Sequence, residues 1–489
     1  MACGRRSVMR RSDCVLDCDG GYFMKYRVFP AYVCAAVLCT GCAGMIDTTV
    51  TERPYYETLV PEEGPLPGIP AEVNYADYWI RAVPYPDEPI MTAEDIEAFN
   101  RDNPFSGSGI IDITALADKC EGANIRRYIA DNARYLLERR YLVTGAIPLE
   151  QTERLRIVAL MDTAGVPDTI TLRFGVVLDR TLGRVWPTAV PLYEDIGDNE
   201  FDQGVTAELD MGETVALLHT SKDGLWSFVQ TSMFLCWVPS GTVAFGDRAT
   251  VAGFVNCSPP LVATAHRVSV YGSPEEKVAV GSIQMGSTLP IRTAGTDFCE
   301  VLVPGRDVNG RLAVHVGYVR RSSDISIGYL PYTLRNLYRQ CFVLFGRRYG
   351  WGGMYGERDC SRYIMDVFGC FNIRLPRNSA GQSKVSRAVV ELDGLDRDAK
   401  LDILRTLPRG ISLLYMPGHI MILLGTMDGT PYAIHDFWAW RTPTDSGPDI
   451  VHRVARVAVT DLMLGTDSEK GAFIDRLSRV AILGNYRVK

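Results

Sequence analysis

One helical face stands out in the N-terminal part of the chain. Its residues fall at i, i+3, i+4, i+7 and i+11, which is the spacing along one side of an α-helix: Ile125, Tyr128, Ile129, Asn132 and Leu136. Residues 92–95, Thr-Ala-Glu-Asp, match a capping box and predict the start of a second, shorter helix. The pattern therefore predicts a mainly helical domain over residues 75–165.

Between residues 168 and 326 the pattern changes to short apolar runs broken by Gly, Pro and Asp, which is typical of short strands. A repeat runs through this region. Residues 211–215 (MGETV) recur as residues 285–289 (MGSTL), and residues 226–229 match residues 300–303 at the same offset. The repeat predicts two related, small β-barrel domains.

From residue 327 onward, apolar runs with helical spacing alternate with runs that are typical of buried strands. The residues after Cys360 keep a helical stripe, so Cys360 is expected in the first turn of a buried helix. Residues 420–425 and 432–434 are short apolar runs separated by a turn signal, Asp428-Gly429. They predict two adjacent antiparallel strands, and the whole chain is predicted to be a multidomain α+β protein.

Composition and charge narrow the function classes. The chain has 489 residues, of which 47% are hydrophobic and 22% charged, and these fractions exclude a disordered, collagen-like or coiled-coil protein. The formal net charge is −7, with 51 basic and 58 acidic residues. A general nucleic-acid-binding role therefore has no electrostatic support, and nucleic acid is not an expected partner.

The N-terminus has the pattern of an export signal. Residues 24–27 (MKYR) are basic, residues 28–38 are apolar, and Cys39-Thr-Gly-Cys42 follows. The apolar run is too short to span a bilayer. The end of the segment resembles a bacterial lipobox, which makes Cys42 the expected lipid-bearing residue. We expect residues 1–23 to be an upstream extension, with Met24 as the natural start. An ordinary secretory signal and a single membrane anchor are the alternatives.

Cys360 is the candidate nucleophile. A helix N-terminus favours thiolate over thiol, so we expect a lowered pKa at this position. A cysteine nucleophile also needs a base and an orienting partner. His419 and His435 lie at suitable places on the two predicted strands, where His419 would act as general base and His435 would hold its far ring nitrogen. The alternative is that Cys360 is only a small buried apolar residue.

Neither a metal nor a cofactor is expected. The cysteines and histidines have no metal-ligand spacing. The glycine-rich stretch at residues 350–353 also lacks the Lys-Ser/Thr pair that would follow in a phosphate-binding loop.

These motifs resemble the NlpC-type family of bacterial cell-wall peptidases, which are papain-like thiol peptidases. The likeness is carried, in order, by Tyr349-Gly-Trp-Gly-Gly, Asp359-Cys-Ser, Leu375-Pro-Arg-Asn-Ser-Ala-Gly-Gln, Gly418-His419 and His435. The β-barrel repeats resemble the bacterial SH3-like domains that accompany such enzymes. The resemblance implies hydrolysis of the amide between the γ-carboxyl of D-Glu and a diamino acid in peptidoglycan stem peptides or muropeptides. It also implies a preference for stems with a free N-terminal L-Ala.

The resemblance also implies roles for individual residues. Tyr349 would lie by the oxyanion, and Asp359 and Ser361 would contact the stem, with Asp359 taking the free ammonium group. Arg377 and Ser379 would meet the diamino acid or its carboxylate. Two positions depart from the family pattern. Asn378 stands where many relatives have Asp, and Arg362 stands where Gly is frequent, so Arg362 would crowd or recharge the cleft.

Two other functions stay open. The first is a catalytically silent, murein-binding lipoprotein that serves as a scaffold, and the second is a related acyl- or amide-transferase that acts on lipid. The expected location of the peptidase is the cell envelope, as a membrane-anchored lipoprotein facing the periplasm or extracytoplasmic space.

The predicted organisation has these parts: residues 1–41, signal peptide with its upstream extension; 42–74, lipidated N-terminus and Pro-rich tether; 75–165, helical domain; 168–249 and 250–326, first and second SH3-like domains; and 327–489, papain-like cysteine peptidase domain.

Overall fold

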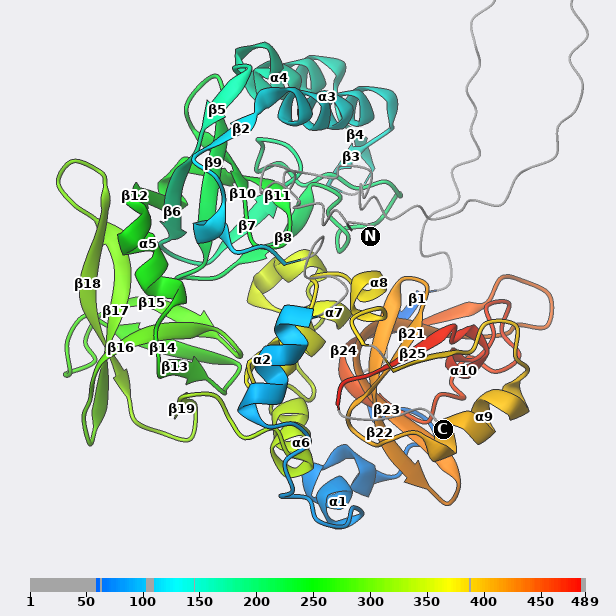
Figure 1. Ribbon diagram of the computed structural model, residues 1–489. Helices are drawn as coiled ribbons and strands as arrows, with labels where there is room; N and C mark the ends of the chain where they lie inside the picture. Colours follow the sequence, from blue (N-terminus) through cyan, green and yellow to red (C-terminus); the bar gives the residue numbers. More distant parts are fainter. Residues whose placement is uncertain (1–58, 62–63, 103–109, 145, 387, 485–489) are drawn as a thin grey trace, which may run out of the picture.

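A computed structural model of the chain describes residues 59–61, 64–102, 110–144, 146–386 and 388–484 (Figure 1). The described residues form three seven-stranded sheets with helices between and around them. The predicted multidomain α+β class, with two small β-domains ahead of a C-terminal domain, is therefore confirmed. The signal segment 1–41 and the predicted lipid site at Cys42 lie outside the described residues.

The first SH3-like domain is built on the sheet β12-β6-β9-β10-β11-β7-β8. Its strands are β6 (Arg173–Val177), β7 (Thr181–Arg184), β8 (Val205–Leu209), β9 (Thr214–Thr220), β10 (Trp226–Gln230), β11 (Leu235–Pro239) and β12 (Val243–Gly246). Helix α5 (Arg248–Val255) leads to the second domain.

The second SH3-like domain has the sheet order β15-β14-β18-β17-β16-β13-β19. Its strands are β13 (Pro260–Ala263), β14 (Arg267–Tyr271), β15 (Ala279–Gln284), β16 (Thr288–Ala294), β17 (Phe298–Arg306), β18 (Leu312–Arg320) and β19 (Ile325–Ile327). The sequence repeat marks the same turn in both domains. Gly212 before β9 has φ +90° and Gly286 before β16 has φ +80°, backbone angles that glycine adopts without strain.

The predicted helices exist, but they do not form one domain. Helix α2 (Ala93–Asp102) starts with the predicted capping box, because the Asp95 N–H donates to Thr92 Oγ1 at 3.2 Å and the Thr92 N–H donates to Asp95 Oδ2 at 3.0 Å. Together with α1 (Ala76–Arg81), α2 packs into the core of the C-terminal domain, where Trp79 is fully buried.

Helices α3 (Gly122–Glu138) and α4 (Gln151–Met161) pack instead against the first SH3-like domain. One link between them is the Trp186 indole, which donates to the carbonyl of Asn132 at 2.8 Å. The predicted helical domain 75–165 is thus divided between two cores. An apolar stripe indicates that a helix face is buried, but it does not say which neighbour covers it. Two short strand pairs accompany these helices: β2 (Lys119–Glu121) with β5 (Thr169–Thr171), and β3 (Leu142–Val143) with β4 (Ile147–Pro148).

The end of the predicted tether is also part of the C-terminal domain. Strand β1 (Leu59–Pro61) pairs in parallel with β24 (Ile450–Thr460) at the edge of the third sheet. Leu66 and Val73 are buried in the same core, and the Trp79 indole donates to the Val73 carbonyl at 2.8 Å. The described residues of the predicted tether therefore belong to the C-terminal domain.

The C-terminal domain places helix α7 against the third sheet, whose order is β1-β24-β23-β22-β21-β25-β20. Its other strands are β20 (Val389–Glu391), β21 (Ser412–Met416), β22 (His419–Met427), β23 (Thr430–Thr442) and β25 (Arg479–Ile482). Its helices are α6 (Leu334–Val343), α7 (Cys360–Gly369), α8 (Ser379–Gln382), α9 (Arg397–Thr406) and α10 (Phe473–Arg476). Tyr363, Ile364 and Phe368 anchor α7 because their side chains are fully buried.

Among the described residues, no helix combines the length and the apolar character that a bilayer crossing requires. The cysteines of the described part without a predicted role are free thiols: Cys120, Cys236, Cys257, Cys299, Cys341 and Cys370.

Candidate active site

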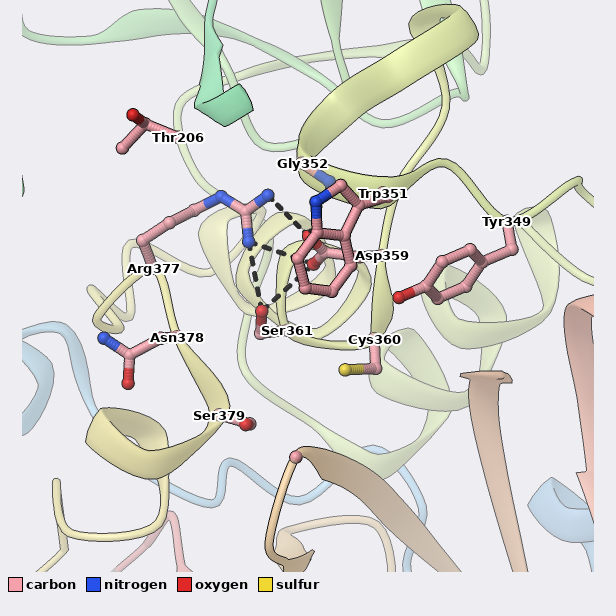
Figure 2. Close-up of a pocket in the computed structure, with 11 residues that line it drawn as sticks. Thr206, Tyr349, Trp351, Gly352, Asp359, Cys360, Ser361, Arg377, Asn378 and Ser379 are labelled. Atoms are coloured by element: carbon pink, nitrogen blue, oxygen red, sulfur yellow. Dashed lines mark hydrogen bonds and ion pairs between the residues drawn. The ribbon is translucent and has the colours of Figure 1, made fainter. Parts of the chain in front are cut away.

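A cavity of about 100 Å³ opens at the N-terminus of α7. Its wall combines four separate segments of the sequence (Figure 2). Most of the lining comes from the C-terminal domain, and one residue comes from strand β8 of the first SH3-like domain. The lining residues are Thr206, Tyr349, Trp351, Gly352, Asp359, Cys360, Ser361, Arg377, Asn378, Ser379 and Gly418.

Cys360 is the first residue of α7, as its sequence context predicts. Asp359 is the N-cap and accepts a hydrogen bond from the Arg362 N–H at 2.9 Å. The Cys360 side chain lines the cavity, although the residue is only 7% exposed. Burial raises the pKa of the Cys360 thiol, and the carboxylates of Asp359 and Asp436 raise it further. The expected lowering of this pKa is therefore wrong in direction, because burial outweighs the effect of the helix N-terminus.

We expect Cys360 to react slowly with iodoacetamide at pH 7. Only the thiolate is alkylated, and with a raised pKa the rate should increase about tenfold per pH unit up to at least pH 9. Mass spectrometry of the peptide that contains Cys360 measures the rate, and a Cys360→Ser variant supplies the background from other cysteines. A rate that already levels off below pH 7 would contradict this prediction.

The two histidines meet as predicted from their strands. His419 begins β22 and His435 lies in β23, the neighbouring antiparallel strand. His419 Nε2 and His435 Nδ1 are 2.7 Å apart, and His435 Nε2 lies 3.0 Å from Thr460 Oγ1. If the Thr460 hydroxyl accepts from His435 Nε2–H, then His435 Nδ1 accepts from His419 Nε2–H. This arrangement leaves Nδ1 of His419 unprotonated and able to act as a base.

Both imidazoles are held neutral. Burial lowers the pKa of His419 to about 3, with a smaller contribution from Arg476, and burial also lowers the pKa of His435 well below its usual range. His435 stacks on Phe437 with ring centroids 4.3 Å apart. Nothing in the local sequence could have identified Thr460. It lies on β24, and only the pairing of β24 with β23 brings it to His435.

The start of β22 lies beside the thiol. Gly418, directly before His419, lines the same cavity as Cys360, and the backbone of Ile420 counters a small part of the rise in the pKa of Cys360. The contacts of the His419 ring are to His435 and Phe473. Within the described part of the chain, no hydrogen bond joins His419 to Cys360. The structure therefore brings the histidines of the two strands together and places the thiol beside the start of β22.

Asp359 and Arg377 bind each other. The Arg377 guanidinium donates to both carboxylate oxygens of Asp359, at 2.9 and 2.8 Å, and to Ser361 Oγ at 3.0 Å (Figure 2). The resemblance implied separate roles, with Asp359 on an ammonium group and Arg377 on a carboxylate. In this structure each is the other's partner, because opposite charges at the N-cap of α7 and on the loop before α8 lie within hydrogen-bond distance.

Tyr349 and Ser379 both line the cavity. Figure 2 shows the Tyr349 hydroxyl directed toward Cys360. Ser379 is the first residue of α8, and Asn378 caps that helix by accepting from the Gly381 N–H at 2.7 Å. The departure from the family pattern at Asn378 thus has a local structural role.

The glycine-rich loop is shaped by the first SH3-like domain. Gly352 and Gly353 have φ values of +57° and +94°. A Cβ at Gly352 would lie 2.5 Å from Val205, and a Cβ at Gly353 would lie 2.2 Å from Glu208 Oε2. Side chains at either position would therefore collide with β8. This contact brings Thr206 into the cavity wall, a position with no signal in the local sequence.

Arg362 does not reach the cavity. Its side chain is 4% exposed and contacts three carboxylates: Glu208 at 3.0 Å, Asp366 at 2.5 Å and Asp210. The expectation that Arg362 crowds or recharges the cleft is wrong, since the side chain points from α7 toward the first SH3-like domain.

A cysteine at the N-terminus of a helix, packed on an antiparallel sheet that carries a hydrogen-bonded histidine pair, defines the papain-like class of α+β folds. Comparison with known protein families agrees with this class and matches two parts of the chain to particular families. Residues 346–427 match the NlpC/P60 family, and residues 191–239 match the SH3 domain of the SH3b1 type. The chain thus carries an NlpC/P60 domain, which belongs to a class of cysteine peptidases, together with an SH3b domain.

A solved structure supports the fold. An NlpC/P60 endopeptidase from Photobacterium damselae subsp. piscicida is 18% identical, with a TM-score of 0.69 over 83% of this chain and 96% of that one. An NlpC/P60 family protein from Bacillus cereus ATCC 10987 is 19% identical, with a TM-score of 0.41 over 57% of this chain and 82% of its own. No curated protein sequence matches the chain.

Proposed function

We propose that the protein is a thiol endopeptidase that hydrolyses the γ-D-glutamyl–diamino acid amide in peptidoglycan stem peptides. One observation carries the proposal. Cys360 is the first residue of α7 and lines a cavity that Gly418 also lines. The adjoining His419 is hydrogen-bonded to His435, and His435 is in turn hydrogen-bonded to Thr460. The match of residues 346–427 to the NlpC/P60 family supports the same chemistry.

In the proposed reaction, Cys360 Sγ attacks the γ-carbonyl carbon while its proton passes to Nδ1 of His419. Because the resting pair is neutral, transfer accompanies attack rather than precedes it. His419 approaches the thiol when substrate is bound, as catalytic hydrogen bonds commonly tighten in the Michaelis complex. The C–N bond then breaks, the amine of the diamino acid takes the proton, and a thioester remains. Water, deprotonated by His419, hydrolyses the thioester and frees the thiol.

His435 and Tyr349 would assist the reaction. His435 holds Nε2 of His419, which fixes the orientation of the ring and stabilises the imidazolium that forms. The Tyr349 hydroxyl is directed toward Cys360 and would donate to the developing oxyanion. Asp359, Ser361, Arg377 and Ser379 would contact the stem peptide on either side of the scissile bond.

A preference for stems with a free N-terminal L-Ala is part of the proposal. Asp359 is the acceptor that an ammonium group would use, and it lies one residue from the nucleophile. We expect the wild-type protein to release L-Ala-D-Glu from tripeptide and tetrapeptide stems at least about tenfold faster than the same stems with an acetylated N-terminus. Mass spectrometry of the products measures both rates. Equal cleavage would refute the free-amine preference, and cleavage at another bond would refute the assigned reaction.

A catalytically silent scaffold would be favoured by the two departures from the family pattern, Arg362 and Asn378. Both side chains have structural partners, so neither residue favours that alternative. The lipid-directed transferase alternative predicts acylated products in the same mass spectra. The proposed location is the cell envelope, with Cys42 carrying lipid, and it is supported by the basic, apolar and Cys-ending pattern of residues 24–42.

A further inference from the structure

Two phenyl rings cover the histidine pair, and no step of the proposed reaction uses them. The centroid of the Phe473 ring, on α10, lies 6.3 Å from that of His419 and 5.3 Å from that of His435. Phe437, on β23, stacks on His435 at 4.3 Å and meets Phe473 edge-to-face at 5.6 Å. Both phenyl rings are buried. The pair therefore lies against an aromatic wall that Phe473 completes.

Contacts from outside its own short helix hold Phe473 in place. Helix α10 has four residues, which are too few to form a stable helix alone. Lys400, a buried residue of α9, donates from Nζ to the carbonyls of Asp475 and Leu477, both at 2.7 Å. Arg397, also on α9, donates to both carboxylate oxygens of Asp475 at 2.8 and 2.7 Å. Helix α9 therefore fixes α10, and with it the phenyl ring, against the histidine pair.

Few charged or titratable groups face the histidine pair. Arg476, on α10, is the charged side chain that acts on His419. Asp436, the residue after His435 on β23, acts instead on Cys360, whose neutral thiol lies beside the start of β22. The adjoining strands contribute only uncharged neighbours: Met416 of β21, and Ala458 and Thr460 of β24. Within the described part of the chain no carboxylate pairs with either imidazole, so burial is the main cause that lowers the pKa of His419 to about 3.

We propose that Phe473 is a positioning residue of the peptidase reaction, which keeps water away from His419 and His435 so that Nδ1 of His419 stays free to take the Cys360 proton. The inference rests on the proposed function and goes beyond it, because it assigns a role to a side chain that does not line the cavity. The physical reason is that an imidazolium is poorly stabilised where neither water nor a carboxylate reaches it. Without Phe473, water would reach the pair, and His419 would be protonated at a higher pH.

The test measures kcat/KM of the complete chain on a stem tripeptide at pH 5.5 and at pH 7.5, since this quantity reports the titration of the free enzyme. In Phe473→Ala the pKa of His419 should move toward its ordinary value of about 6.5, at which about one tenth of the imidazole is unprotonated at pH 5.5. We therefore expect the ratio of kcat/KM at pH 5.5 to that at pH 7.5 to fall about tenfold below the wild-type ratio.

Phe371→Ala is the matched control. Phe371 is as deeply buried in the same core and packs on Tyr332 at 5.2 Å, and neither histidine is among its ring contacts in the described residues. It should lower the thermal midpoint to a similar extent as Phe473→Ala but leave the pH ratio within about twofold of the wild type. Phe473→Leu keeps most of the apolar bulk and should retain most of the wild-type ratio, while its smaller fall keeps the test decisive if the alanine variant does not fold.

Histidine NMR supplies a readout that does not depend on turnover. The Cε1–H signals of His419 and His435, assigned with His419→Gln and His435→Gln, should not titrate between pH 5 and pH 8 in the wild-type protein and should titrate in Phe473→Ala. Titration in the wild type, an unchanged titration or pH ratio in folded Phe473→Ala, or an equal shift in Phe371→Ala would overturn the inference and leave the peptidase assignment intact. Absence of turnover by the wild-type protein at either pH would instead overturn the proposed function, and this role of Phe473 with it.

Discussion

Replacing Cys360 by alanine is expected to abolish the release of stem dipeptide from purified muropeptides, with a loss of at least about 1,000-fold. The nucleophile is the one group in the proposed reaction that forms a covalent bond to the substrate, so no neighbouring side chain can substitute for it. Product formation is measured by mass spectrometry. The thermal midpoint should change little, because only one sulfur atom is removed from a residue at the cavity wall.

Cys370→Ala is the matched control for this experiment. Cys370 is a fully buried free thiol at the other end of the same helix, and its replacement should cost about 1 kcal/mol of stability without loss of turnover. Undiminished release by the Cys360→Ala protein would refute the mechanism. An equal loss of activity in both variants would indicate damage to α7 rather than loss of a nucleophile.

Replacing Arg362 by leucine should destabilise the protein more than any substitution at the cavity surface. The guanidinium is 4% exposed and contacts Glu208, Asp210 and Asp366. Its removal leaves buried carboxylates without their shared cation, which typically costs about 3–5 kcal/mol. The measurement is the midpoint of thermal or urea unfolding, followed on the complete chain.

Arg156→Leu is the control for Arg362→Leu. Arg156 pairs with Glu153 on an exposed helix surface, where its side chain is 54% exposed, and such pairs contribute at most about 1 kcal/mol. Equal midpoints for the two variants would contradict the buried-network account. Higher turnover by Arg362→Leu with unchanged stability would instead restore the view that this arginine obstructs the cleft.

The sequence allowed several local features to be predicted correctly. The helical face from Ile125 to Leu136 is α3, the capping box at Thr92 starts α2, and the repeated Met-Gly turns precede β9 and β16. Each depends on spacing within a few residues, because helix period, cap chemistry and turn glycines act along the chain itself. The pairing of His419 with His435 belongs to this group, since a short turn keeps neighbouring strands in register.

Features that join distant segments could not be predicted in the same way. The helices predicted as one domain pack in two cores, and the tether residues Leu66 and Val73 enter the C-terminal core. Apolar periodicity indicates that a face is buried but carries no information about its partner. The lowered pKa expected at Cys360 is wrong for a related reason, because the pKa depends on the burial of the thiol and on the carboxylates of Asp359 and of Asp436, which lies on β23.

By itself, then, the sequence determined the order of the elements, the placement of Cys360 at a helix start and the two histidines on adjacent strands. Only the tertiary structure decided what surrounds them. It brings Thr206 from the first SH3-like domain to the cavity, pairs Asp359 with Arg377, and buries Arg362 away from the cleft. The physical reason is that a buried charge must find an opposite charge within a few ångströms, and those partners come from wherever the packed domains place them.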